Sequence, residues 1–312
     1  MKAKRPIQSM SVVASLALCI ACGGGEIDND GGVGDGDAGG TIDAPMSVVD
    51  SGPVADAENC QPPDMLFVLD RTMSMHRRPD GTVPADDPAG HMESKWYLAI
   101  SAIEMVTQEL QETVRFGLEL FPVDRGGDVC VTLSQRISGI TATNVQCEEG
   151  EVPVAPDIQT GNAIAGAIDH ETTRLCRSTP IGAGLGTAID ALAAIQDPIR
   201  DQYAVLLTDG QDTCDEPLSL ANAQALGGAG VGLYVIGFDG SGNGVDNGHL
   251  NDLACAGRTA PNFASACMED GNGGYIAVER DGPALYLLAS DANELSTQLE
   301  MVAGQVCCNC IE

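Results

Sequence analysis

Short apolar runs alternate with longer amphipathic segments along most of this chain, and that alternation constrains the fold more than any other feature. The runs have the length and aliphatic content of buried strands: 65–69, 114–121, 203–207 and 231–238. The longer segments carry apolar residues at steps of three and four, which predicts helices: 93–113, 180–196, 216–226 and 291–302. Weaker signals indicate a short strand at 129–133 and a helix at 162–172. Strands that alternate with helices predict a doubly wound α/β fold, in which a mainly parallel sheet is covered by helices on both faces.

Oxygen-bearing side chains stand where three of these elements begin or end. Asp70, Thr72 and Ser74 follow the first strand at alternate positions, and Asp209 follows the strand at 203–207. Thr179 stands at the start of a predicted helix, next to Pro180. In an open parallel sheet, ligands bind outside the carboxyl ends of the strands, so these groups should converge there. Two carboxylates and three hydroxyls suit a hard divalent cation such as Mg²⁺.

These segments resemble the von Willebrand factor type A domain with its metal-ion-dependent adhesion site. The family pattern is Asp-x-Ser-x-Ser, then a distant Thr, then an Asp in a Thr-Asp-Gly turn. The matching positions here are Asp70, Thr72, Ser74, Thr179 and Asp209. Residues 116–118 and 234–237 also resemble the family, and the similarity extends over about residues 62–305, with 122–177 and 260–274 fitting poorly.

The resemblance implies a function for the site. It implies that hydroxyl oxygens ligate Mg²⁺ (or Mn²⁺ or Ca²⁺) directly, that some carboxylates act through water, and that a vacant position accepts a carboxylate from a partner protein. Thr72 replaces the usual Ser; it keeps the hydroxyl but is stiffer at χ1.

Each element of the site also has an ordinary structural interpretation. Thr179 would serve as the N-cap of a helix without any metal, and Asp209-Gly210 would be a common turn. All three segments occur in the expected order, each at the expected end of a strand or helix. That coincidence favours a metal site.

A small basic cluster surrounds the first of these segments. It consists of Arg71, His76, Arg77 and Arg78. One hypothesis is that the cluster steers an anionic partner toward the metal. The alternative is a solvated loop that continues through residues 79–93.

The charge of the chain limits its partners. The formal net charge of -30 argues against nucleic acid, whose phosphates require Lys and Arg, and against electrostatic binding to an anionic membrane. An acidic protein partner would need a bridging cation. Aromatic residues make up only 4% of the chain, so the core should be aliphatic.

The first residues have the features of a bacterial lipoprotein signal. Residues 1–22 combine a positive start with a short apolar stretch that ends at Cys22, which we expect to be lipidated. The alternative is plain secretion with cleavage after Ala21. Residues 23–59 are rich in Gly and Asp, which predicts a disordered acidic tether to a folded domain at 60–312. We therefore expect a lipid-anchored protein of the cell envelope, at the outer membrane or the cell surface.

Ten further cysteines are expected in the exported chain. An even number in an oxidising compartment predicts disulfides, although connectivity cannot be deduced from sequence. The candidates are Cys60, Cys130, Cys147, Cys176, Cys214, Cys255, Cys267, Cys307, Cys308 and Cys310. A soft-metal site at residues 307–310 is the alternative for the last three.

A protein-binding, adhesion-like module is the function that these features favour. The alternatives are a disulfide-rich structural protein of the envelope and a metal-assisted hydrolase. None of the four histidines stands in a recognisable catalytic motif, and Thr72 occupies the position where an aspartyl-phosphate phosphatase needs a second Asp. The sequence therefore predicts that the protein is not an enzyme.

Overall fold

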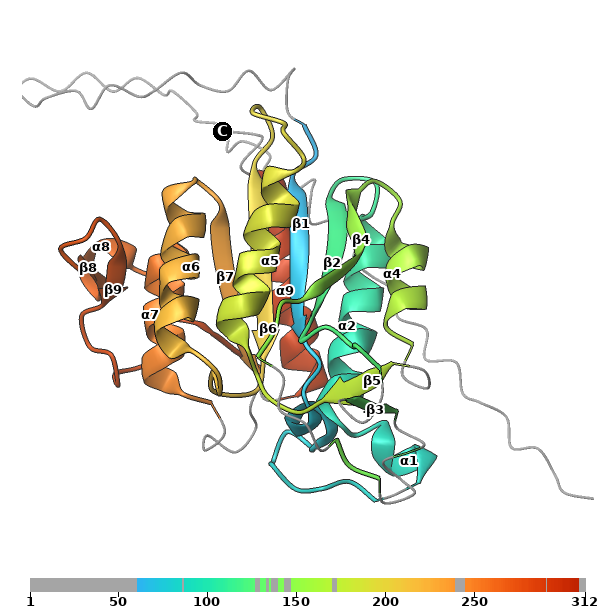
Figure 1. The fold of residues 1–312 in the computed structure, drawn as a ribbon. Coiled ribbons are helices and arrows are strands. Elements are labelled where there is room, and N and C mark those ends of the chain that lie inside the picture. The colour runs from blue at the N-terminus through green and yellow to red at the C-terminus, as the bar shows by residue number, and fades with distance from the viewer. Residues whose placement is uncertain are drawn as a thin grey trace, which may run out of the picture. The chain divides into compact units, whose positions relative to one another are not determined.

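A six-stranded sheet forms the centre of the computed structural model, with strand order β10-β7-β6-β1-β2-β4 (Figure 1). The four predicted strands are confirmed as β1 (Asp64–Asp70), β2 (Arg115–Phe121), β6 (Gln202–Thr208) and β7 (Gly232–Phe238). These strands run parallel to one another, as does the short edge strand β10 (Leu287–Ala289). The other edge strand, β4 (Glu151–Asp157), is antiparallel to β2 and was not predicted.

The structure describes residues 61–308 except for eight short gaps: 86, 127–129, 133–134, 136–139, 143–146, 170–172, 239–244 and 290. The predicted signal at 1–22, the tether at 23–59 and the cysteines Cys22, Cys60 and Cys310 lie outside this part of the chain. No helix within the described part combines the length and the hydropathy that a bilayer crossing requires.

Alternation of side chains along β1 creates two separate cores. Met65, Phe67 and Leu69 face one side of the sheet, Leu66 and Val68 face the other, and all five are buried. A strand that buries both faces reads as a continuous apolar run, which is why 65–69 was recognisable in the sequence.

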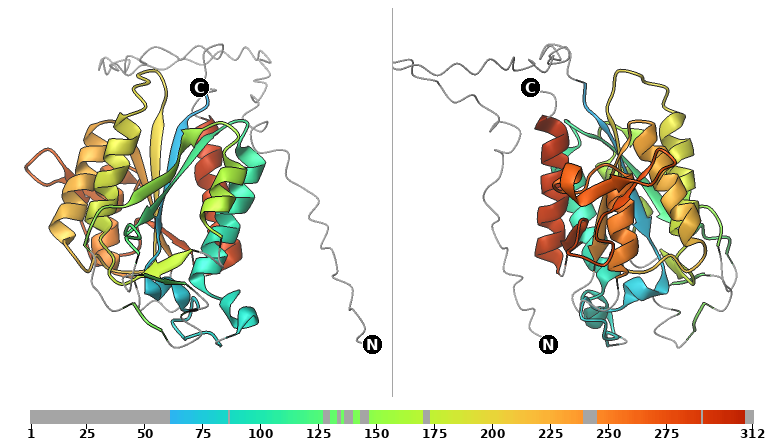
Figure 2. Two further views of the ribbon diagram at one scale, coloured as in Figure 1. Left: turned by 45° about the vertical axis from the view of Figure 1, so that its right-hand side comes forward. Right: turned by 90° about the vertical axis from the view of Figure 1, so that its left-hand side faces the viewer.

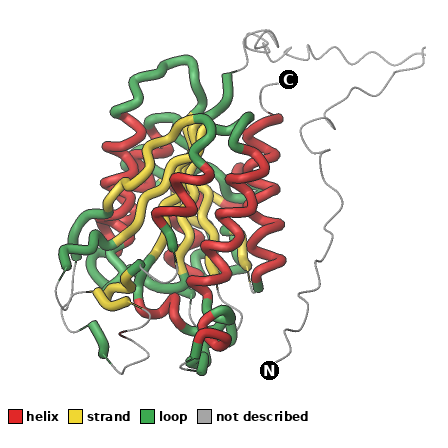
Figure 3. Tube along the Cα trace, turned by 90° about the vertical axis from the view of Figure 1, so that its right-hand side faces the viewer, coloured by secondary structure: helices red, strands yellow, loops and turns green. Residues whose placement is uncertain are grey.

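Three helices cover each face of the sheet. On the first face lie α2 (Lys95–Leu110), α4 (Gly161–Ala167) and α9 (Ala292–Cys308), which pack with Phe67 and its neighbours. On the second lie α5 (Ile181–Ala193), α6 (Glu216–Gly228) and α7 (Asn247–Ala256). Figure 1 shows α5 and α6 in front of the sheet and α9 behind it, and Figures 2 and 3 show the same layers from the side. The doubly wound α/β fold predicted from the alternation is confirmed.

Several predicted boundaries differ from the structure. The weak helix at 162–172 is the shorter α4, and the strand at 129–133 is β3 (Cys130–Thr132), which pairs with β5 (Arg174–Cys176) outside the main sheet. A second small sheet, formed by β8 (Cys267–Glu269) and β9 (Tyr275–Ala277), was not predicted, nor was α7. Other short helices are η2 (Met73–His76), α1 (Pro88–His91) and α8 (Phe263–Ala266).

Among the described residues, three disulfides join six of the predicted cysteines. The pairs are Cys130–Cys176, Cys147–Cys214 and Cys255–Cys267. The side chains of Cys307 and Cys308 lie outside the described part of the chain. The prediction of a disulfide-supported domain is therefore confirmed for these six residues.

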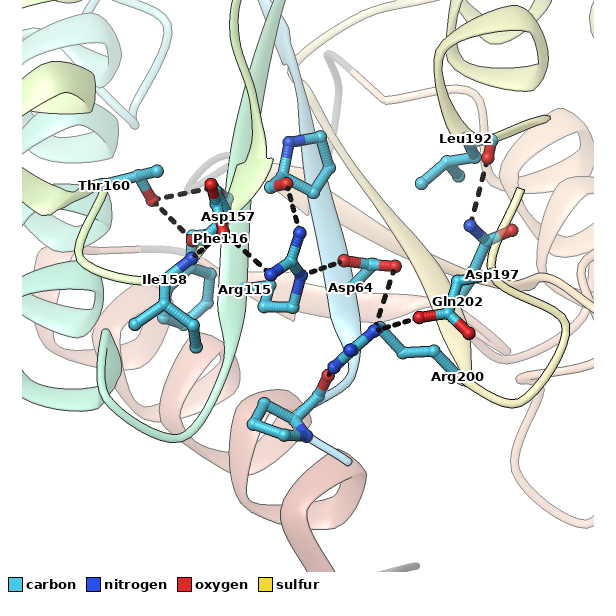
Figure 4. A network of polar contacts seen from close by, with 12 residues as sticks. Asp64, Arg115, Phe116, Asp157, Ile158, Thr160, Leu192, Asp197, Arg200 and Gln202 are labelled. Carbon is cyan, nitrogen blue, oxygen red and sulfur yellow. Dashed lines mark hydrogen bonds and ion pairs between the residues drawn. The ribbon is translucent and has the colours of Figure 1, made fainter. Parts of the chain in front are cut away.

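A charge network around the buried Asp64 holds the amino ends of the central strands (Figure 4). Arg115 Nε of β2 donates to Asp64 Oδ1 of β1 at 2.8 Å, and Arg200 Nε lies 3.9 Å from Asp64 Oδ2. Burial raises the pKa of Asp64, and the two guanidinium groups oppose that shift. The network also reaches Asp157 of β4, which pairs with Arg115 Nη1 at 2.7 Å. It therefore ties three neighbouring strands together at the end opposite to Asp70.

Candidate metal centre

The carboxyl ends of β1 and β6 meet at the point where the strand order reverses. β1 pairs with β2 on one side and with β6 on the other, and its last residue is Asp70. Thr208 ends β6, so Asp209 follows directly at the same edge of the sheet. Adjacent strands whose connections lead in opposite directions leave a crevice there, which is where open α/β sheets bind ligands.

A chain of hydrogen bonds links the first segment to Asp209. The Thr72 amide donates to Asp70 Oδ1 at 2.8 Å, which shapes the turn after β1. The hydroxyls of Thr72 and Ser74 lie 2.8 Å apart, and the Ser74 hydroxyl donates to Asp209 Oδ1 at 2.7 Å. Because the Ser74 proton goes to Asp209, Ser74 accepts from Thr72. Side-chain oxygens separated by 135 positions in sequence thus lie in direct contact.

Thr179 is fastened to the loop that follows Asp209. Its amide donates to Thr213 Oγ1 at 2.8 Å, and the Thr213 amide donates to the Thr179 carbonyl at 3.0 Å. The Gly182 amide donates to Asp212 Oδ2 at 2.9 Å. A Cβ added at Gly210 would lie 3.9 Å from Thr179 Oγ1, so the Thr179 hydroxyl lies beside the residue that follows Asp209.

The prediction that Thr179 caps its helix is wrong. Helix α5 begins at Ile181, its N-cap residue is Pro180, and the side chain that accepts from an amide of its first turn is that of Asp212, through Gly182. The Thr179 hydroxyl is therefore not committed to the helix end and remains available to the site.

Asp70 is a buried carboxyl group with a strongly shifted pKa. Burial, and then the charge of Asp209, raise its pKa from 3.8 to about 7. The Thr208 hydroxyl donates to Asp70 Oδ2 at 2.7 Å and opposes the shift. Two carboxylates that repel each other in a buried position are stabilised by a cation between or beside them.

Lys95 supplies a positive charge at the site that no sequence motif indicates. Its ammonium group contacts Asp209 Oδ2, and both side chains are buried. Lys95 is the first residue of α2 and lies 21 positions after Ser74, with no motif connecting the two. The contact becomes visible only in the folded structure, where the start of α2 lies beside the residue that follows β6.

The donor set fits a hard divalent cation. It consists of hydroxyl and carboxylate oxygens, which Mg²⁺, Mn²⁺ and Ca²⁺ prefer. Within the described ranges, no group of three or more His, Cys, Asp or Glu side chains is placed to hold a metal ion, so a cation here would depend on the hydroxyl oxygens as well. The residues that could hold the cation are Asp70, Thr72, Ser74, Thr179 and Asp209.

Two of the disulfides fasten the loops that carry these residues. Cys176 lies three positions before Thr179. Its backbone forms an isolated parallel β-bridge with Thr72, and its amide donates to the Arg71 carbonyl at 2.9 Å. Its partner Cys130 belongs to β3 of the small sheet. Cys214 lies five positions after Asp209 and is bonded to Cys147. The sequence predicted disulfides but not their position at the site.

The basic cluster proposed to steer partners is only partly at the surface. Arg71 and His76 are buried, and Arg71 pairs with Glu151 at 2.7 Å and donates to the Pro122 carbonyl, so neither can present a charge to a partner. Arg78 pairs with Glu93 at 2.6 Å. Arg77 is exposed and donates to the Gly81 carbonyl. Arg71 and His76 are therefore excluded as residues that steer a partner. The steering hypothesis now concerns only Arg77 and Arg78, and the charge of Arg78 is partly neutralised by Glu93.

A serine, a histidine and a carboxylate also meet between α6 and α7, away from these loops. Ser219 Oγ lies 2.8 Å from His249 Nε2, and His249 Nδ1 lies 3.5 Å from Glu216 Oε1. The Ser219 hydroxyl is completely buried and donates its proton to the Glu216 carbonyl at 2.7 Å, so His249 Nε2 must be the donor to it. Burial lowers the pKa of His249. A nucleophilic serine needs the opposite arrangement, with its proton directed to an accepting imidazole.

The sequence profile of the von Willebrand factor type A domain family matches residues 151–270. This range contains Thr179 and Asp209 and begins after Ser74. Together with the topology described above, the match identifies the fold as that of the von Willebrand factor type A domain. No curated protein sequence matches the chain.

Solved structures with similar folds have low sequence identity. The PilB minor pilin of Streptococcus sanguinis is 15% identical over 79% of this chain and 61% of its own, with a TM-score of 0.50. Proximal thread matrix protein 1 of the mussel byssus, with a zinc-occupied MIDAS motif, is 19% identical over 81% of this chain and 47% of its own, at 0.48. The pilus adhesin SpaC of Lactobacillus rhamnosus GG is 16% identical over 80% of this chain and 31% of its own, at 0.49. The chain thus spans about a third to three fifths of the length of these structures.

Proposed function

We propose that this protein is a divalent-metal-dependent binding module that engages a carboxylate of a partner protein. The single observation that carries the proposal is the hydrogen bond of 2.7 Å from Ser74 to Asp209, which brings separate ligand-bearing segments into one cluster. Thr179 lies beside that cluster next to Gly210. The proposal is for binding rather than for catalysis, in keeping with a Ser219 hydroxyl that is buried and committed to a backbone carbonyl.

The residues of the site divide the work between them. The hydroxyls of Thr72, Ser74 and Thr179 would hold the cation without neutralising it, while Asp70 and Asp209 balance its charge from a buried position. The bound cation supplies a positive centre that attracts an external carboxylate. For a chain of net charge -30, such a centre offsets the repulsion of any acidic partner.

We further propose that the module is displayed at the bacterial cell envelope through a lipid on Cys22 and the tether at 23–59. A surface location agrees with the disulfides, which form and persist in oxidising compartments. The pilin and pilus adhesin that share the fold are surface proteins by name, and this chain is proposed to share that setting.

Replacing a ligand should abolish metal binding. In calorimetric titrations of Mg²⁺ into the full chain, we expect Asp70→Ala and Ser74→Ala to weaken binding by at least about a hundredfold, because even residues that only orient ligands cost about ten- to a hundredfold. The control is Asp80→Ala, an exposed aspartate of the following loop that accepts from Thr82. Equal affinity in wild type and both ligand variants would refute the site.

Partner binding has a separate test. Capture of proteins from an envelope extract should be lost when a chelator is added and also when Asp70 is replaced by Ala. Capture that persists under both conditions would instead favour a disulfide-rich structural protein of the envelope.

Metal affinity should depend on pH near neutrality. The pKa of Asp70 is raised to about 7 in the folded protein and is about 3.9 when unfolded. In the metal-free protein this group therefore adds stability that is full below about pH 4 and is lost as the pH rises through about 7. Because a ligand must be deprotonated, the apparent Mg²⁺ affinity should fall by up to about tenfold per pH unit below 7. Titrations at about pH 5.5, 6.5 and 7.5 measure this, and an affinity independent of pH would contradict it.

A further inference from the structure

Lys95 places a cation of the protein itself on the carboxylate that the metal site needs. Its ammonium contacts Asp209 Oδ2, while Asp209 Oδ1 accepts from Ser74. The two side chains are buried, so solvent screens their attraction only weakly. Lys2, Lys4 and Lys95 are the lysines of the chain, and Lys95 is thus the only one within the folded domain.

The position of Lys95 is not explained by local helix stability. It is the first residue of α2, whose N-cap Ser94 accepts from the Tyr97 amide. The amino end of a helix carries partial positive charge and favours acidic side chains, so an ammonium group there is disfavoured by its own helix. The contact with Asp209 offsets that cost and identifies the carboxylate as the reason for burial.

We propose that Lys95 is a built-in competitor of the divalent cation, which must displace its ammonium from Asp209 before the site is fully formed. This inference rests on the proposed function of the same site. The contact is an ion pair, so a second cation can take the place of the ammonium group beside the same carboxylate oxygen. A tethered monovalent cation at an acidic site keeps the metal-free state folded and raises the metal concentration at which the site fills.

The competition predicts a gain of affinity when the charge of Lys95 is removed. In calorimetric titrations of Mg²⁺ into the full chain, we expect Lys95→Met to bind Mg²⁺ about tenfold or more tightly than wild type, because positive charges a few ångströms apart in a buried site repel strongly. The matched control is Arg77→Met, which removes the charge of an exposed side chain. Arg77 is a neighbour of Lys95, because its backbone carbonyl accepts from the Lys95 amide at 2.8 Å. That variant should bind within about twofold of wild type, since the exposed charge is screened.

The outcomes separate the two proposals. Equal or weaker binding by Lys95→Met, with wild type still binding Mg²⁺, would overturn the competition and leave the metal site intact. The absence of binding in both proteins would overturn the metal site and the competition together. Binding by Lys95→Met alone would support both.

A second measurement uses the unmodified protein, in case Lys95→Met does not fold. The rate of acylation of the Lys95 amine can be followed by peptide mapping, and Lys2 and Lys4 lie in other peptides. Displacement predicts that saturating Mg²⁺ raises this rate severalfold. An unchanged or lower rate, under conditions in which calorimetry shows Mg²⁺ bound, would overturn the proposal.

Discussion

Removing the Cys130–Cys176 disulfide should lower both the stability of the domain and its affinity for Mg²⁺. The two cysteines are 46 positions apart, and a cross-link that closes a loop of this length contributes about 4 kcal/mol to the free energy of unfolding in the chain-entropy treatment. We expect the double variant Cys130→Ser, Cys176→Ser to lose about that amount in denaturant unfolding. The backbone of Cys176 forms a β-bridge with Thr72, and Cys176 lies three positions from Thr179. The segments that carry Thr72 and Thr179 would therefore both be held less firmly in the variant.

The loss of Mg²⁺ affinity also arises from conformational entropy. Residues that are no longer held must be ordered when the cation binds, and each ordered residue costs about 1–2 kcal/mol of conformational entropy. A single such residue is enough for a fall in Mg²⁺ affinity of about tenfold, which calorimetry can measure.

The third disulfide provides the matched control. Cys255–Cys267 spans only 12 positions and joins the end of α7 to β8, and neither element carries a proposed ligand. Its removal should cost about 3 kcal/mol of stability and leave Mg²⁺ affinity unchanged. If both pairs changed the affinity equally, or if neither did, the support of the site by Cys130–Cys176 would be disproved.

Replacing Glu119 by Met should stabilise the protein, and the gain should increase with pH. Glu119 lies within β2 next to Val68, its side chain is completely buried, and neither carboxyl oxygen has a hydrogen-bond partner among the described residues. Burial raises its pKa well above 4.5. Replacing a buried unsatisfied polar group by an apolar side chain of similar length should add about 1–3 kcal/mol to the free energy of unfolding.

The sign of the pH dependence follows from the raised pKa. Glu119 contributes stability that is full below its unfolded pKa of about 4.3 and is lost as the pH rises through its folded pKa. The advantage of Glu119→Met over wild type should therefore be small at about pH 4.5 and larger at about pH 8. The exposed Glu269 of β8 serves as the control, because Glu269→Met should change stability by less than about 0.5 kcal/mol at either pH. A destabilised or pH-independent Glu119→Met variant would contradict the prediction.

The central strands were predictable because their side chains are buried on both faces. The runs around Phe67 and Val205 are apolar without interruption, which is typical of a strand that is buried on both faces. Edge strand β4 has an alternation broken by Pro153 and Pro156 and has several exposed residues, so its sequence carries little strand signal. The pairs β3–β5 and β8–β9 consist of three-residue strands, which are too short to carry a strand pattern. A disulfide joins β3 to β5, and another ties β8 to α7.

The site was predictable in part for a similar reason. Asp70, Ser74 and Asp209 follow recognisable strands, and the topology of a parallel sheet brings those strand ends together. Their hydrogen-bonded contact agrees with that expectation, while their role as metal ligands remains a prediction. Lys95 and Thr213 could not be found in the sequence, because the residue that each contacts at the site lies far away along the chain.

The course of β1 determines how the domain would respond to tension. Any segment that precedes residue 61 joins the amino end of β1, next to Asp64 and its arginines, and the proposed binding position lies at the other end of the same strand. A pull between an anchor and a held partner would therefore act along β1 itself. Parallel neighbours on both sides mean that the strand could slide out only by breaking two ladders of backbone bonds in shear at once. Hydrogen bonds that are loaded together in shear withstand a larger force than bonds that break one after another. The domain would therefore stay folded while a bound partner pulls against the anchor.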